Sequence, residues 1–596
     1  MRAIRWIGRI ILYGLAALGG LTVAGLVAVA IFAGRLQEPV AELPDSIVLS
    51  VDFRNGVVEG PKRGLLPNIG GGGENVLRDV VEALEAAAKD DRVKGLVARF
   101  GGERIDLAHA QELRDAVAAF RKSGKFTKAF AESFGGLRNG TVEYYLAAAF
   151  EQVWLQPSGN VGLIGAAIEM PFLKGALEKL DVETRIEQRH EYKSAAELLT
   201  RSGLSEPARR SLKRLVESWL VQIVRGIAED RRLGHDTVNR LVDTGPHLGA
   251  DARQLGLVDR HGYWDEVVSA VQKDARTDVK LISVNDYLAA AGRPNAAGPR
   301  VALIYGVGPI VPGRERPSPF TGTRRFHADT VGQAISDAIE DDSIKAILFR
   351  VDSPGGAYVP SDSVWRKLKY ARSRGKLVIV SMGHLAASGG YFVAMAADKI
   401  VAQPGTVTGS IGVYGGKLVT EAFWDKLGIR WDGVQAGKRA RMWSQIGDYP
   451  PGAKERVGQL LDSVYDDFTN KAAKSRGLTD DQIDAMARGR VWTGADAKER
   501  GLVDELGGFR VAIGLIKERL GLAPEDPIDI VVLPRPLSPI EQVLEAIQDG
   551  GIEARSLVAN LFGSGPLGGE LGTIIETLDL LSPVGVLQAP PFRLAR

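Results

Sequence analysis

The sequence predicts an α/β protein made of two copies of one domain and preceded by a transmembrane helix. Short apolar runs alternate with helical stretches, which is the pattern of an α/β domain. Similar segments recur at offsets of 245 and 247 residues, which indicates duplication. An uncharged run near the N-terminus is long enough to cross a bilayer.

Length and composition are those of a globular protein. The chain has 596 residues, of which 45% are hydrophobic and 25% are charged, so several domains are expected. The net charge of +2 gives no electrostatic reason to expect a nucleic-acid partner. The absence of cysteine excludes disulfides, thiolate metal sites and a cysteine nucleophile.

The N-terminal run, residues 10–34, is predicted to be a retained membrane anchor. Three arginines precede it: Arg2, Arg5 and Arg9. The positive-inside rule then keeps residues 1–9 in the cytoplasm and exports the rest. The prediction is a single-pass protein of the bacterial inner membrane with most of the chain outside the cytoplasm. A cleaved signal peptide, processed near residues 28–30, is the alternative.

The internal repeat defines the domains. Residues 156–165 match 403–412, and residues 248–253 match 493–498. A repeat with only two copies indicates duplicated domains rather than a solenoid.

The predicted domain boundaries follow from this repeat and from the composition between the copies. The first domain is expected at 45–290 and the second at 300–533, joined by a linker rich in Gly, Pro and Ala at 290–299. The tail, 534–596, has no assignable pattern. A glycine run at 70–73 is not followed by the Gly-Lys-Ser/Thr of a phosphate loop and predicts a plain loop.

The second copy gives the clearest element pattern. Its strands are predicted at 301–307, 345–351, 376–382 and 399–402. Its helices are predicted at 329–340, 361–373, 389–397 and 452–475.

Ser388 lies where a buried strand meets a helix rich in small residues. A hydroxyl at this position can cap the helix, which is the ordinary role of such a serine. Small residues on both sides, including Gly389 and Gly390, also let the backbone of a substrate come close.

The two copies differ at this point. At the offset of 247, Thr141 stands opposite Ser388, while Lys193 falls in a segment opposite residues 439–441. One half has the hydroxyl and the other has a lysine, which suggests one site assembled from both. Serine needs a base, and a buried lysine can serve if its pKa falls, although most lysines are solvated surface charges. His384 is expected to face away from Ser388.

The segment 352–356 follows a strand and contains Pro354, Gly355 and Gly356. A turn of this composition exposes backbone N–H groups, as an oxyanion hole requires. A plain tight turn is the alternative.

Together these residues resemble the long, duplicated form of signal peptide peptidase A, a membrane-anchored Ser-Lys protease family. The resemblance covers about residues 45–535 and the anchor. Its motifs occur in the expected order at 352–356, 386–391 and 408–412, with Lys193 in the first half. The chain departs from the family pattern at His384, where an acidic residue is common, and in the tail.

The resemblance implies roles for five residues. Ser388 would be the nucleophile, Lys193 the general base and Ser410 the residue that orients the lysine. Gly356, by similarity also to the proteolytic subunit of the Clp protease, and Gly389 would donate N–H groups to the oxyanion.

The resemblance also implies a Clp/crotonase-like superhelix in each domain and a homotetramer. The implied substrates are remnant signal peptides, bound extended in an apolar groove. A catalytic lysine needs no metal, so neither a metal nor a cofactor is expected.

Three alternatives remain open from the sequence. The chain could be a Ser-Lys protease of specific membrane proteins, a crotonase-like acyl-CoA enzyme, or a non-catalytic scaffold. Whether Lys193 meets Ser388 within one chain or between chains is also open.

Overall fold

The computed structural model describes residues 42–60, 74–102, 105–315, 324–535, 541, 586–588 and 593–594. The predicted cytoplasmic segment and anchor, residues 1–34, and the glycine run at 70–73 lie outside these ranges. Among the described residues, no helix combines the length and the apolar character needed to span a bilayer.

The first half of the chain is built on a six-stranded sheet with the order β11-β6-β5-β4-β1-β12. All its strand pairs are parallel. The strands are β1 (Ile47–Asp52), β4 (Val93–Phe100), β5 (Phe126–Ala131), β6 (Gln152–Leu155), β11 (Arg260–His261) and β12 (Lys280–Ser283). The helices of this half are α2 (Leu77–Lys89), α3 (Leu107–Arg121), α4 (Thr141–Ala147), α5 (Lys174–Lys179), α6 (Glu197–Thr200), α7 (Glu206–Arg231), α8 (His235–Thr244), α9 (Gly249–Gln254), α10 (Trp264–Ala275) and α11 (Val284–Ala291).

The second half repeats this arrangement. Its parallel strands follow the order β23-β19-β18-β16-β13-β24, and β20 and β22 continue from the end of β18. The strands are β13 (Arg300–Val307), β16 (Ile344–Ser353), β18 (Leu377–Ala387), β19 (Lys399–Ala402), β20 (Val407–Gly409), β22 (Val491–Thr493), β23 (Glu505–Leu506) and β24 (Asp529–Leu533). The helices are α12 (Ala328–Glu340), α13 (Tyr358–Ser373), α14 (Gly389–Ala394), α15 (Glu421–Lys426), α16 (Ala453–Arg476), α17 (Asp480–Met486), α18 (Gly494–Glu499) and α19 (Phe509–Arg519).

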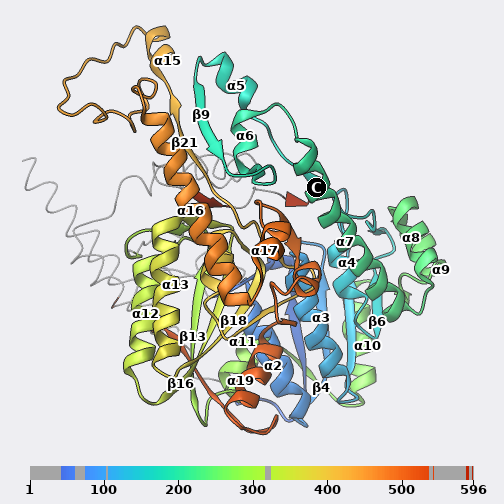
Figure 1. Ribbon diagram of the computed structural model, residues 1–596. Helices are drawn as coiled ribbons and strands as arrows, with labels where there is room; N and C mark the ends of the chain where they lie inside the picture. The colour runs from blue at the N-terminus through green and yellow to red at the C-terminus, as the bar shows by residue number, and fades with distance from the viewer. Residues whose placement is uncertain are drawn as a thin grey trace, which may run out of the picture.

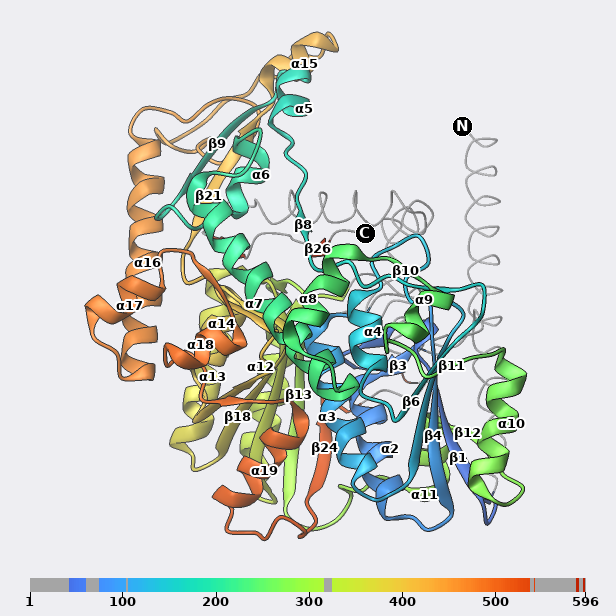
Figure 2. The ribbon, with the colours of Figure 1, turned by 90° about the vertical axis from the view of Figure 1, so that its right-hand side faces the viewer.

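The shared strand order confirms the predicted duplication of a mixed α/β unit, and the two halves lie side by side in Figure 2. Equivalent side-chain contacts recur as well. The Tyr144 hydroxyl donates to the Leu257 carbonyl at 2.7 Å, and the Tyr391 hydroxyl donates to the Leu502 carbonyl at 3.1 Å. These two hydrogen bonds join the equivalent helices, α4 and α14, to equivalent backbone carbonyls of the two halves.

The elements predicted for the second copy are confirmed, with boundary differences. The strand expected at 376–382 continues to Ala387, and the helix expected at 361–373 begins at Tyr358. The helix expected at 389–397 ends at Ala394. The linker is shorter than predicted, because α11 continues to Ala291.

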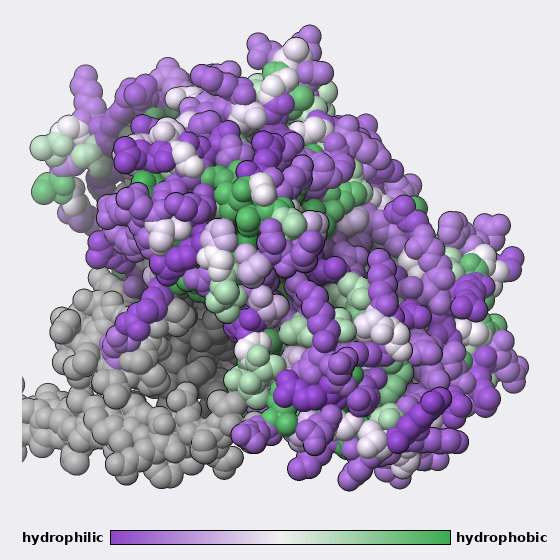
Figure 3. All heavy atoms as spheres, turned by 90° about the horizontal axis from the view of Figure 1, so that it is seen from below, coloured by the Kyte–Doolittle hydropathy of each residue, from purple (hydrophilic) through white to green (hydrophobic). Residues whose placement is uncertain are grey.

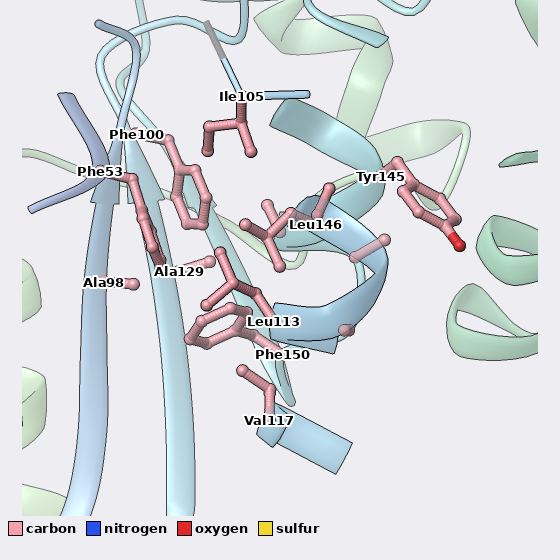
Figure 4. Close-up of a cluster of buried hydrophobic side chains, with 14 of the residues drawn as sticks. Phe53, Ala98, Phe100, Ile105, Leu113, Val117, Ala129, Tyr145, Leu146 and Phe150 are labelled. Atoms are coloured by element: carbon pink, nitrogen blue, oxygen red, sulfur yellow. The ribbon is translucent and has the colours of Figure 1, made fainter. Parts of the chain in front are cut away.

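The core of the first half shows why these elements form. Apolar side chains from β4 and β5 meet apolar faces of α3 and α4, as Figure 4 shows for a cluster that includes Phe100, Leu113 and Phe150. Removing such side chains from water is the main stabilising term of the fold. In the view of Figure 3 the described surface is mostly hydrophilic, with smaller apolar areas near its middle.

One strand of the first half leaves its own sheet and pairs with the second half. β9 (Glu183–Gln188) runs antiparallel to β21 (Tyr414–Val419) over six residue pairs. With α5, α6 and α15 these strands form an arm that projects from the two sheets (Figures 1 and 2). The exchange brings the segment after β9 to the second half.

Two short strands of the C-terminal tail, residues 534–596, pair with strands of the two halves. β25 (Val586–Gln588) pairs antiparallel with β17 (Gly355–Ala357) and with β21. β26 (Arg593–Leu594) pairs with β8 (Ile168–Glu169). β17 in turn pairs with β14 (Ile310–Val311).

Candidate active site

Ser388 stands at the end of β18, directly before α14, and is completely buried. Its backbone is strained, with φ +56° and ψ −114°, a conformation that costs about 1–3 kcal/mol for a residue with a side chain. The hydroxyl makes no capping bond to the helix. The helix-cap interpretation of this serine is therefore wrong, and the strained backbone directs the hydroxyl elsewhere.

That hydroxyl meets Lys193 within the same chain. Lys193 follows β9 and is also completely buried, and its Nζ lies 2.6 Å from Ser388 Oγ. Burial lowers the pKa of Lys193 well below its ordinary value, because an ammonium group loses hydration energy in the interior. Burial therefore favours the neutral amine, which carries a lone pair.

Ser410 supplies the remaining contacts of the amine. Lys193 Nζ donates to the Ser410 carbonyl at 2.9 Å and to Ser410 Oγ at 3.1 Å. The backbone of Ser410 has φ +51°, and its N–H donates to the Arg490 carbonyl at 2.7 Å. A neutral amine that gives its two N–H bonds to Ser410 keeps its lone pair for the Ser388 hydroxyl.

Lys193 is held in place by backbone packing against the second half. The Tyr192 N–H donates to the Arg488 carbonyl at 3.1 Å. A Cβ at Gly489 would come within 2.3 Å of Lys193 N, and one at Gly412 within 3.2 Å of Lys193 Cδ. Sequence reasoning did not predict that these two glycines pack against Lys193, although Gly412 lies two residues after Ser410, which the resemblance placed beside the lysine.

The two glycines expected at the oxyanion hole lie against each other beside Ser388. A Cβ at Gly389 would be 3.1 Å from Gly356 N. Gly356 has φ +155°, and a Cβ there would be 2.2 Å from the Ile310 carbonyl oxygen. The expected Pro-Gly-Gly turn is in fact the short strand β17. Both peptide N–H groups therefore come from backbone that cannot accept a side chain.

The same strand borders a slot that receives an extended backbone. β25 lies between β17 and β21, with Leu587 opposite Gly356 and Val586 opposite Tyr414. This is the way in which a peptide strand adds to a sheet edge. The backbone arrangement at Ser388 can thus accommodate a peptide.

Among the described residues of the first half, the position equivalent to Ser388 has a different role. Thr141, opposite Ser388 in the repeat, accepts hydrogen bonds from the N–H groups of Ile164 and Gly165 at 3.0 Å each. Its hydroxyl supports the backbone. The sequence expectation that His384 faces away from Ser388 agrees with its contacts, which are with Asp352 and His109.

Taken together, a buried serine, a buried lysine of lowered pKa and two close glycine N–H groups can support acyl transfer. The structure brings Ser388, Lys193 and Ser410 into contact, and Gly356 and Gly389 flank them.

Comparison with known proteins identifies a family and several relatives of this chain. The model for "Peptidase family S49" matches residues 133–278 and 370–523. "Protease 4" of Salmonella typhi is 32% identical over 75% of this chain and 72% of the relative. "Serine protease SPPA, chloroplastic" of Arabidopsis thaliana is 30% identical over 79% of this chain and 70% of the relative. "Protease 4" of Haemophilus influenzae is 29% identical over 76% of each.

Proposed function

The chain belongs to peptidase family S49 and is a serine protease of the long, duplicated signal peptide peptidase A form, and we propose that it hydrolyses remnant signal peptides with a Ser-Lys dyad. The observation that carries this proposal is the 2.6 Å contact between Lys193 Nζ and Ser388 Oγ in a buried site.

In the proposed reaction, Ser388 Oγ attacks the peptide carbonyl carbon while neutral Lys193 takes the hydroxyl proton. The N–H groups of Gly356 and Gly389 stabilise the oxyanion, which is worth about 3 kcal/mol per donor. The lysine ammonium then gives its proton to the leaving amine, and an acyl-enzyme remains. Water then attacks the ester carbonyl carbon while the neutral lysine takes a proton from the water. The lysine ammonium returns this proton to Ser388 Oγ as the acyl group leaves as an acid.

Ser410 would orient the amine throughout this cycle. Its carbonyl and hydroxyl both accept from Nζ, so they limit rotation of the lysine side chain. We propose no metal and no cofactor in these steps, because a neutral lysine already supplies the base.

The proposed substrates are extended apolar peptides bound as an added strand. The pairing of β25 with β17 and β21 supports this mode, since the slot already holds a backbone of that kind. Peptides left after signal-peptide cleavage are apolar and free of a folded domain, so they can enter it.

The decisive experiment uses the purified full chain in detergent. A fluorophosphonate probe should attach to one serine, identified as Ser388 by mass spectrometry, and a synthetic signal peptide should be cleaved. Ser388→Ala should abolish both, while Ser353→Ala, a serine whose hydroxyl bonds the Gly308 carbonyl, should still be labelled.

Labelling at another serine would contradict the proposed nucleophile. Cleavage of one intact membrane protein but not of free signal peptides would favour the alternative substrate class, a Ser-Lys protease of specific membrane proteins.

We further propose a single-pass protein of the bacterial inner membrane with the sheets outside the cytoplasm, supported by the charge pattern around residues 10–34. Membrane fractionation of the full chain and of a chain lacking residues 1–34 tests this. Recovery of both in the soluble fraction would contradict it.

Self-association as a homotetramer is also proposed. Large apolar side chains follow α15 at the arm and are exposed: Leu427, Ile429, Trp431 and Val434. Such clusters mark interaction surfaces. Light scattering should give a mass four times that of the chain, and Trp431→Asp should lower it; a monomeric wild-type mass would contradict the proposal.

A further inference from the structure

A cluster of metal-binding side chains lies where the two halves meet behind the active site. His109, on α3 of the first half, approaches His384, on β18, and Asp352, on β16. One donor atom from each of the three residues can lie within 4.8 Å of the other two. The two imidazole rings have centroids 5.6 Å apart.

One buried nitrogen in this cluster, His109 Nδ1, has no hydrogen-bond partner among the described residues. The His109 side chain is only 4% exposed. Buried polar atoms are almost always satisfied, so this nitrogen indicates a missing ligand.

The second nitrogen of His109 is held as in metal sites. His109 Nε2 lies 2.8 Å from Glu59 Oε1, and Arg350 donates to both carboxylate oxygens of Glu59. A carboxylate held in this way on the second nitrogen of a histidine is the arrangement of carboxylate–histidine–metal triads.

The second histidine faces the carboxylate of the cluster. His384 Nδ1 lies 2.8 Å from Asp352 Oδ1, a distance that either a proton on Nδ1 or a metal ion accounts for. A proton on His384 Nδ1 leaves His109 Nδ1 without a partner, whereas a divalent metal ion contacts both nitrogens.

We propose that His109, His384 and Asp352 bind a zinc ion. Two imidazoles and a carboxylate are a donor set that zinc accepts. Water or Asp106 would be the fourth ligand of the zinc ion. Asp106 Oδ2 lies 3.8 Å from His109 Nδ1 and 3.9 Å from His384 Nδ1. Zinc bonds of about 2.0–2.1 Å require the donors to move closer together, which rotations of the side chains can provide.

The site joins the halves next to the catalytic residues but takes no part in the chemistry. Asp352 lies four residues before Gly356, and His384 lies four residues before Ser388. A metal here would fix β16 and β18 against α3. The proposal departs from the expectation that the chain holds no metal, and it does not depend on Ser388 being the nucleophile.

The test uses the full chain, purified without a histidine tag, stripped with a chelator and titrated with zinc chloride by calorimetry. We expect one zinc ion per chain and a raised thermal midpoint. X-ray absorption at the zinc edge should show two imidazole ligands. His384→Gln should weaken binding by at least about 100-fold, and Asp352→Asn by about 10- to 100-fold.

His235→Gln is the matched control, because His235 is exposed on α8, and it should bind as the wild type does. If the wild-type chain takes up no stoichiometric zinc, or if the absorption spectrum lacks two imidazoles, the proposal is wrong even where a variant fails to fold. Equal affinity in wild type and His384→Gln would also overturn it and leave a proton on His384 as the cation.

Discussion

The two halves of the chain share a scaffold but not a chemistry. Both have the same order of parallel strands and the same buried tyrosine bond between helix and backbone. Yet β18 runs on to Ala387 and delivers Ser388, whereas β5, its equivalent, ends at Ala131. The first half instead extends β9 into the arm and delivers Lys193.

This difference teaches how a duplicated fold can divide one reaction. Each half keeps the contacts that hold its sheet and helices together, and the two proposed catalytic groups, Ser388 and Lys193, come from positions at which the halves differ. Substitutions at equivalent positions should therefore have unequal effects on activity where the halves diverged and equal effects on stability where they did not.

The largest asymmetry is expected between Ser388 and Thr141. Ser388→Ala should lower kcat/KM by about 10⁴-fold or more, as removal of a catalytic nucleophile does. Thr141→Ala should leave kcat/KM unchanged and lower stability by about 1–3 kcal/mol, because two N–H groups, one buried and one partly buried, lose their acceptor. Peptide hydrolysis and urea unfolding check both. A comparable loss of activity in the two variants would remove the proposed division of labour.

The next test compares two buried lysines, Lys193 and Lys128. Lys128 lies on β5 and has partners, with its Nζ 2.6 Å from Asp274 and 2.8 Å from Gln152. Lys193→Met should lower kcat/KM by about 10³-fold or more, whereas Lys128→Met should keep wild-type activity. Steady-state kinetics on an apolar peptide ester measure kcat/KM for both variants. Retained turnover in Lys193→Met would exclude the lysine as base.

The same pair makes a prediction about pH. The pKa of Lys193 is lowered in the folded chain, while in the unfolded chain it has its ordinary value of 10.5. Between these values the unfolded chain binds more protons, so the folded state loses about 1.4 kcal/mol per unit as pH falls. Lys193→Met should therefore gain stability at neutral pH, with a gain that vanishes near pH 10.5.

Lys128→Met should show no such gain, since its ammonium has a carboxylate partner. In the wild type, kcat/KM should fall as pH drops through the lowered pKa of Lys193, because the protonated amine cannot act as a base. Urea unfolding and pH–rate profiles measure these effects. A stability difference independent of pH would show that Lys193 is charged in the folded protein.

A smaller effect is expected at the joint between the halves. Gly489→Ala puts a Cβ against the Lys193 backbone, and a displacement of about 1 Å at a catalytic group costs about 10²-fold in rate. Gly477 also has a positive φ, of +65°, but has open space around it. Gly477→Ala should cost only about 1–2 kcal/mol of stability. If both variants have equal kcat, packing at Gly489 does not position the lysine.

Gly489 also shows where prediction from the sequence ends. The repeat, the strand–helix junction at Ser388 and the helices of the second copy follow from local patterns, and the structure agrees with them. The difference between the two copies singled out Lys193, and the resemblance to a known family gave it the role of base and added Ser410. The crossing of β9 into the second half is a long-range contact, which no local pattern encodes, so the residues that hold Lys193 could not be found.

His109 and Glu59 escaped prediction for the same reason. Both are far from His384 in the sequence. His109 meets His384 because α3 packs at the boundary between the sheets, and Glu59 contacts His109. Pairing of the halves, rather than the fold of either one, creates both the contact between Lys193 and Ser388 and the histidine cluster.

The smallest effect tests the part of the scaffold that both halves share. Tyr144→Phe and Tyr391→Phe each remove a buried hydroxyl that donates to a backbone carbonyl, at 2.7 Å and 3.1 Å respectively. Each should lower stability by about 1 kcal/mol, and neither should change the KM for peptide. Because α14 follows Ser388 directly, a selective fall of kcat in Tyr391→Phe would mean that this bond positions the nucleophile. Equal, purely structural losses would mean that duplication preserved the scaffold of each half independently of catalysis.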